Sequence, residues 1–147
     1  MNYKKLVHED SFIVRYMDYM SYVETAESYD FWCAVWAIGD ACGRRVYVDR
    51  PNIPVYLNWY IILAAESGST RKSTAITSVA RIVEDNGRPL LTGKTSPESL
   101  DLLLHEQSRM FGGASVSFAV SELVTTLGRE GYMSAMPGLL TDLYDCP

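Results

Sequence analysis

The chain has 147 residues, of which 48% are hydrophobic and 21% are charged. This length and composition suit one folded domain with a sizeable core, and they exclude an intrinsically disordered chain. The net charge of −5 excludes a basic field over the whole surface, so nucleic acid would have to bind at a local basic strip or through a missing part of the protein.

The spacing of metal-binding residue types argues against a zinc site. Cys33, Cys42 and Cys146 are far apart in the sequence, and the two histidines stand alone. Separated thiols in odd number are typical of a reducing cytosol. The N-terminal residues turn acidic before any apolar stretch, unlike a signal peptide, and the apolar run 55–65 is far shorter than the ~20 residues of a membrane helix. We therefore expect a soluble, cytoplasmic protein with no membrane partner.

The first part of the chain is predicted to be helical. Residues 11–24 place apolar side chains at helical spacing, and residues 28–42 repeat the pattern with more aromatic residues. Gly43 stands where a glycine that ends a helix is expected. Three arginines follow it, namely Arg44, Arg45 and Arg50. They indicate either a solvated helix end or a basic patch for a strand of DNA. We assign residues 1–50 to a helical N-terminal segment.

The remaining residues, 51–147, alternate predicted strands with predicted helices. Within them, strands are expected at residues 55–65, 89–92 and 114–120, and helices at residues 73–85, from Pro97 to about Gly112, and at 134–144. One more short strand is expected at residues 46–48, at the end of the N-terminal segment. The continuous apolar run 55–65 is typical of a strand that is buried on both faces. This alternation predicts an α/β domain with a mostly parallel sheet. Because few strands are present for such a sheet, we expect an incomplete domain.

The loop that follows the apolar run has features of a phosphate-binding loop. Such a loop needs backbone N–H groups at a helix N-terminus, a lysine that reaches the phosphates, and a hydroxyl group for Mg²⁺. Lys72 and Ser73 hold the last two positions. Arg71 and Glu66 stand where the consensus has glycine, so the consensus itself is not met. The alternative is a polar turn whose hydroxyl side chains cap the next helix.

A second candidate follows the predicted strand 114–120. Hydrolysis needs an acidic residue at the end of a neighbouring strand, to hold Mg²⁺ through water or to orient the attacking water. Glu122 occupies this place, whereas Ser121 stands where many ATPases carry an aspartate. A serine can bond to a metal-bound water but supplies no charge. The alternative for Glu122 is an acid that stabilises the start of the next helix.

The order of these segments resembles a widespread family of uncharacterised P-loop ATPases of phages and mobile elements, which in turn resemble primase-associated replicative helicases. The similarity covers residues 28–147, and its most specific parts are the loop that ends in Arg-Lys-Ser-Thr and the Ser-Glu-Leu segment at 121–123. The family often carries an arginine before the lysine. The resemblance implies a P-loop NTPase fold of the RecA/AAA+ type, with a mostly parallel sheet covered by helices on both faces.

The resemblance also implies ATP and Mg²⁺ as cofactors and gives roles to particular residues. Lys72 and Glu122 would be catalytic, with Glu122 polarising the water. Ser73 would bind Mg²⁺, and Ser121 would reach the metal through water. The nucleotide would be held by Ser67, Gly68, Ser69, Thr70, Arg71, Lys72, Ser73 and Thr74.

The implied function is ATP binding and hydrolysis in a helicase-like or primase-like DNA replication protein of a phage or mobile element. DNA would contact regions outside these residues, and the full-length protein would form a homo-oligomer. The alternative is a non-catalytic assembly or regulatory module that keeps the loop without turnover. The uncharged Ser121 favours this alternative.

Overall fold

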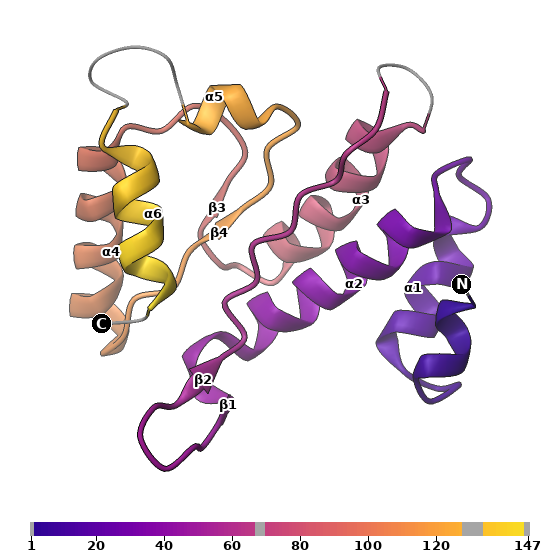
Figure 1. The fold of residues 1–147 in the computed structure, drawn as a ribbon, viewed down its shortest axis with the longest axis horizontal. Coiled ribbons are helices and arrows are strands. Elements are labelled where there is room, and N and C mark those ends of the chain that lie inside the picture. Colours follow the sequence, from indigo (N-terminus) through magenta and orange to yellow (C-terminus); the bar gives the residue numbers. More distant parts are fainter. Residues whose placement is uncertain (1, 67–69, 128–133, 146–147) are drawn as a thin grey trace.

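The computed structural model describes residues 2–66, 70–127 and 134–145, and helices dominate it (Figure 1). The helices are α1 (Phe12–Met20), α2 (Glu27–Cys42), α3 (Lys72–Asp85), α4 (Pro97–Phe111), α5 (Leu123–Leu127) and α6 (Met136–Tyr144), with the 3-10 turns η1 (Tyr3–Leu6) and η2 (Gly43–Arg45). The strands are β1 (Tyr47–Val48), β2 (Val55–Tyr56), β3 (Leu90–Leu91) and β4 (Ser117–Phe118). Each helix predicted from apolar periodicity is confirmed, with its ends shifted by a few residues.

The predicted P-loop NTPase fold, with its mostly parallel sheet, is wrong. In the described part of the chain, β1 pairs with β2 in antiparallel fashion and β3 pairs with β4 in parallel, and each pair is a separate sheet of two strands. Two such small sheets do not make the extended parallel sheet of a RecA-type or AAA+-type domain. The chain is instead a small, mainly helical α/β protein.

The largest difference from the prediction is in the expected central strand. Residues 57–66 run extended from β2 toward the start of α3 (Figure 1), but no strand is assigned to them. Ile62 is 70% exposed and Tyr60 is 54% exposed, so this segment is not buried on both faces. An apolar, β-branched sequence favours extended backbone, but the pairing strand has to come from the tertiary structure.

Contacts with two helices hold this extended segment in place. Tyr60 donates a hydrogen bond to the carbonyl oxygen of Leu140 in α6 at 2.7 Å. Gly39 allows close approach on the α2 side, because a Cβ atom there would lie 2.6 Å from Cδ1 of Trp59. The segment therefore passes between α2 and α6 without a strand partner among the described residues.

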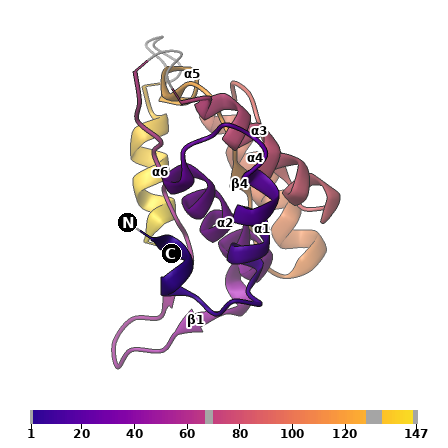
Figure 2. The ribbon, with the colours of Figure 1, turned by 90° about the vertical axis from the view of Figure 1, so that its right-hand side faces the viewer.

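The larger core forms where α2 packs against α1 and α3 (Figure 1, Figure 2). Met17 and Met20 of α1, Ala34 of α2 and Val83 of α3 are all at most 3% exposed. Within α1 the two methionines are three positions apart, so they lie on one face of that helix. Burial of these faces is the main stabilising contribution of the three helices.

A second core holds α4 and α6 against the parallel strand pair. Leu100 of α4 and Met136 of α6 are fully buried in it. In β3, Leu90 packs against the larger core and Leu91 against the smaller one. Successive side chains of a strand point to opposite faces, so β3 joins the two cores. In the described residues, no helix has the length and apolar character needed to cross a membrane.

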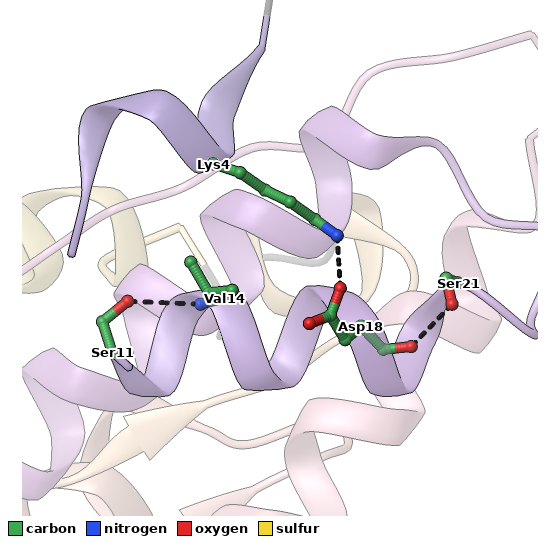
Figure 3. A network of polar contacts seen from close by, with 5 residues as sticks. All are labelled: Lys4, Ser11, Val14, Asp18 and Ser21. Carbon is green, nitrogen blue, oxygen red and sulfur yellow. Dashed lines mark hydrogen bonds and ion pairs between the residues drawn. The ribbon is translucent and has the colours of Figure 1, made fainter. Parts of the chain in front are cut away.

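Helix ends follow the chemistry that the sequence predicts. Ser96 accepts a hydrogen bond from the backbone N–H of Ser99 at 3.3 Å, and Pro97 is the first residue of α4. Gly43 ends α2 with a φ of 52°. Lys4 of η1 forms an ion pair with Asp18 of α1, and this contact links the two elements (Figure 3). This pair is solvent-exposed and contributes little stability.

Asp30 of α2 is a buried carboxyl group whose ionisation should make stability depend on pH. It is 4% exposed and accepts hydrogen bonds from the hydroxyl of Thr25 at 2.8 and 2.9 Å. Burial raises the pKa of Asp30 and the charge of Glu27 adds to the rise, whereas the Thr25 hydrogen bonds oppose it. The folded protein therefore holds this proton more tightly than the unfolded chain does.

The variant Asp30→Asn tests this pH dependence. The stabilisation by the Asp30 proton is fully present below the unfolded pKa of about 3.9 and is lost as pH rises through the folded pKa. We expect the unfolding free energy of Asp30→Asn, relative to the wild type, to increase from about pH 3.5 to about pH 7. Urea unfolding at both pH values measures the difference. A difference that stays constant would show that Asp30 does not titrate with a raised pKa.

Candidate functional site

Three segments line one hollow of about 340 Å³ at the start of α3. They are the end of the extended segment, the residues that open α3, and the residues that follow β4. The lining side chains are Glu66, Thr70, Arg71, Lys72, Ser73, Ser121 and Glu122. The volume falls within the range of small-molecule sites, roughly 300–1,000 Å³. The fold thus brings the candidate loop and the candidate acid to the same hollow, although they are far apart in sequence.

The other predicted residues lie beside this hollow or cannot be placed. Thr74 lines a neighbouring hollow of about 270 Å³ together with Ser73, Thr77, Ser78 and Arg81. Ser73 therefore belongs to both hollows. Ser67, Gly68 and Ser69 lie outside the described residues.

The backbone at Arg71 has the conformation that a glycine would favour. Arg71 precedes α3 with φ 45° and ψ 38°, and it is the only non-glycine residue with positive φ in the described chain. This is the position at which a phosphate-loop consensus has glycine. A left-handed residue next to helical residues can turn successive backbone N–H groups into one concavity that suits an anion. Arg71 therefore has a backbone conformation that the consensus glycine would adopt without strain.

Two backbone N–H groups at the N-terminus of α3 have no hydrogen-bond acceptor among the described residues. The side chain of Arg71 makes no capping hydrogen bond to the helix. The N–H groups of Thr74 and Ala75 already bond to the carbonyl oxygen of Arg71, at 3.0 and 3.2 Å. The N–H groups of Lys72 and Ser73, in contrast, belong to the first turn and lack an intrahelical acceptor. Together with the helix dipole, they favour a negatively charged ligand.

Contacts with α2 and its N-terminal connection fix the loop end of the hollow. The hydroxyl of Tyr29 donates to the carbonyl oxygen of Ala64 at 2.7 Å and lies 3.5 Å from the hydroxyl oxygen of Thr70. Arg71 forms an exposed ion pair with Glu24 at 2.6 Å. The Arg71 guanidinium group therefore already has an acidic partner, whereas no ion pair within the described residues involves Lys72.

The parallel strand pair positions the acidic side of the hollow. The N–H of Ser117 bonds to the carbonyl oxygen of Pro89 at 3.0 Å. The Ser117 hydroxyl also donates to the buried carboxylate of Asp40 in α2 at 2.6 Å. These bonds hold β4 beside β3 and α2, and the chain then leads through Ser121 to Glu122, immediately before α5.

Acidic side chains outnumber basic ones at the hollow. Arg71 and Lys72 line it together with Glu66 and Glu122, and Glu24 forms an ion pair with Arg71 from outside the lining. A bare phosphate would be attracted by the cations and amides but repelled by the carboxylates. A divalent cation between the phosphates and the carboxylates removes that repulsion. The hollow therefore suits a metal-bound phosphate better than a bare one.

The donor set fits Mg²⁺ only together with phosphate. In the described residues, no group of three or more histidine, cysteine, aspartate or glutamate side chains could hold a metal. Mg²⁺ in nucleotide sites is usually held by one or two carboxylates or hydroxyls, by waters and by the phosphates themselves. Ser73, Ser121 and the two glutamates supply such a partial set. These residues would hold Mg²⁺ that arrives with a nucleotide.

Two residues of this site were not predicted from the sequence. Glu66, which stands in place of a consensus glycine, lines the hollow. Its position at the end of the apolar run, directly before the loop, was the available signal. Tyr29 contacts the loop from α2, 41 positions before Thr70. No local pattern connects two residues at that separation.

Substitutions at Arg71 test the left-handed backbone. In this conformation a residue with a β-carbon destabilises the fold by roughly 1–2 kcal/mol, whereas glycine does not. The exposed ion pair with Glu24 stabilises the fold by only about 0–1 kcal/mol. We expect Arg71→Gly to be at least as stable as the wild type. Arg71→Val should be less stable by about 1–2 kcal/mol, because β-branched residues are strongly disfavoured there. Thermal unfolding measures both, and equal stability of the two variants would contradict the assigned backbone.

Comparisons with known proteins identify no relative. No family model matches the chain, and no curated protein and no solved structure is significantly similar to it. The resemblance to ATPases of phages and mobile elements therefore stays a prediction, and the functional argument depends on the hollow itself.

Proposed function

We propose that the hollow at the start of α3 binds the phosphates of ATP as a complex with Mg²⁺. The observation that carries this proposal is that Lys72, Ser73 and Glu122 line one hollow at an uncapped helix N-terminus. The proposal does not depend on a P-loop NTPase sheet. It depends on local geometry, namely the left-handed Arg71 and the amides that follow it.

Each residue has a separate role in the proposed complex. The Lys72 ammonium group and the first amides of α3 would hold the phosphate oxygens, and the Ser73 hydroxyl would be a ligand for Mg²⁺. Bound Mg²⁺ would offset the repulsion between the carboxylates and the phosphates. Glu122 would orient and polarise the water that attacks the terminal phosphorus as the bond to ADP breaks, and Lys72 would stabilise the charge on the phosphate oxygens. A role in replication is proposed from the resemblance alone, and a cytoplasmic location is proposed from the separated cysteines and the acidic N-terminal residues.

The proposal is tested by comparing adenine nucleotides. Because the hollow recognises phosphates, ATP with Mg²⁺ should bind more tightly than AMP, and chelation of Mg²⁺ should weaken ATP binding. Isothermal titration calorimetry with ATP, ADP and AMP, each with Mg²⁺ and with a chelator, measures both effects. Equal affinity for ATP and AMP would contradict a phosphate site.

A second candidate function is a nucleotide-binding module without turnover. The observation that favours it is Ser121, an uncharged residue in the hollow where many ATPases carry an aspartate. Release of inorganic phosphate from ATP distinguishes the two functions. If the wild type hydrolyses ATP and Glu122→Gln binds it without hydrolysis, Glu122 is catalytic. If the wild type binds ATP and releases no phosphate, the module without turnover is the correct function.

A further inference from the structure

Residues 43–60, which comprise η2, the β1–β2 hairpin and the four residues after β2, form a basic, exposed projection on a chain that is acidic as a whole. We call this projection the hairpin. Residues 43–60 contain three arginines and one aspartate, a formal charge of +2, whereas the whole chain carries −5. The hairpin lies at the opposite end of the extended segment 57–66 from the start of α3 (Figure 1, Figure 2). Its charge therefore belongs to a surface separate from the nucleotide hollow.

The arginines of this hairpin divide into two groups. Arg45 donates a hydrogen bond to the carbonyl oxygen of Ala41 at 2.9 Å, so it helps to complete the C-terminus of α2. Arg44 and Arg50 are exposed, and no ion pair within the described residues involves either of them. These two guanidinium groups remain available for a ligand.

One aromatic ring lies beside Arg44, and further rings of the same segment are exposed. Tyr47 of β1 and Tyr56 of β2 are cross-strand partners whose ring centroids are 5.6 Å apart. The Arg44 guanidinium carbon lies 4.8 Å from the centroid of the Tyr56 ring. Tyr47 is 52% exposed, and Trp59, just beyond β2, is 44% exposed. Exposed rings next to unpaired arginines can stack on bases while the arginines contact phosphates.

We propose that the hairpin binds single-stranded nucleic acid. Arg44 and Arg50 contact backbone phosphates, and Tyr47 and Trp59 stack on unpaired bases. A single strand is required because the bases of a duplex are already stacked on one another. Like charges disfavour contact between two such hairpins, so charge complementarity selects a polyanion rather than the same surface of a second copy. This inference does not depend on the nucleotide hollow.

Fluorescence anisotropy with a labelled oligo-dT of about 16 nucleotides, the upper end of common single-strand site sizes, tests the proposal. The double variant Arg44→Ala/Arg50→Ala should bind at least about tenfold more weakly at low salt. The slope of log affinity against log salt concentration should be smaller in magnitude by about 1.4, because each of the two lost phosphate contacts contributes about 0.7 to it. Tyr47→Ala should weaken binding by about fivefold or more, whereas Tyr47→Phe should bind like the wild type.

The matched control is Arg15→Ala/Arg109→Ala, which removes the same charge from exposed arginines of α1 and α4. It should bind like the wild type. Equal losses in the two double variants would overturn the site, because binding would then follow net charge alone. Equal affinity for a duplex of the same length would also overturn it. Oligo-rU in place of oligo-dT shows whether the site prefers RNA or DNA.

Photocrosslinking keeps the proposal testable if a hairpin variant fails to fold. An oligonucleotide that carries 5-iodouracil should crosslink the folded wild type at peptides within residues 46–60. Crosslinks confined to other peptides would overturn the proposal. A wild type that binds no oligonucleotide, but forms a dimer that Arg44→Ala/Arg50→Ala dissociates, would overturn it in favour of a protein interface.

Discussion

Replacing Lys72 with alanine is expected to weaken the binding of ATP with Mg²⁺ by about tenfold or more. Lys72 is half-buried, lines the hollow, and is the first residue of α3. A hydrogen bond between an ammonium group and a phosphate oxygen contributes about 1.5–3 kcal/mol, and each 1.4 kcal/mol corresponds to tenfold in affinity. Calorimetric titration of both proteins measures the change.

Lys5→Ala is the matched control for this prediction. Lys5 is an exposed lysine of η1 that does not line the hollow, so its replacement removes the same charge from elsewhere. It should leave the affinity unchanged. Alanine is a favourable helix residue, so Lys72→Ala should also keep the thermal stability of the wild type. Similar affinities for Lys72→Ala and the wild type would contradict a phosphate contact by this lysine.

Leu100→Ala is expected to lower the unfolding free energy by about 2–5 kcal/mol, the range measured for fully buried leucines. Leu100 is 0% exposed in the smaller core, between α6 and the parallel strand pair. Truncation removes buried apolar area and leaves a cavity. Because small domains are stable by only about 5–15 kcal/mol, the loss is a large part of the total. Urea unfolding followed by circular dichroism measures it.

Leu102→Ala controls for the chemistry of the substitution. Leu102 lies two positions away in the same helix and is 59% exposed. Both variants gain the same helix propensity, so their difference isolates burial. Leu102→Ala should change the unfolding free energy by no more than about 0.5 kcal/mol. Equal effects at the two positions would show that α4 does not bury the face that contains Leu100.

Helices were predictable from the sequence because their determinants are local. In α4, the Ser96 cap and Pro97 set the start of the helix. In α1, Met17 and Met20 recur at helical spacing, and both are buried. Such signals lie within a few residues of one another, so they do not require knowledge of the rest of the fold.

The sheet was not predictable because a strand depends on a distant partner. The apolar run 55–65 favoured extended backbone, and the chain is indeed extended there, but only Val55–Tyr56 pairs with another described strand. The remainder is held by contacts such as the one between Tyr60 and the carbonyl oxygen of Leu140. Composition indicates that a segment prefers extended structure, and it does not specify what covers the segment.

The candidate site was predictable in part. Lys72, Ser73 and Glu122 were proposed from their positions after expected strands, and they line one hollow. The left-handed backbone of Arg71 could not be read from an arginine, because that conformation is set by how the loop enters α3. The same holds for Glu66, since only the fold brings it to the hollow that Glu122 also lines.

The most direct test of the central claim is a nuclear magnetic resonance titration of the ¹⁵N-labelled wild type with ATP and Mg²⁺. The claim is that the first amides of α3 and the Lys72 side chain bind nucleotide phosphates. The largest saturable shifts should therefore occur at the amides of residues 70–74 and 121–122. Absence of saturable shifts, or largest shifts at a remote surface such as Arg44 to Arg50, would contradict it.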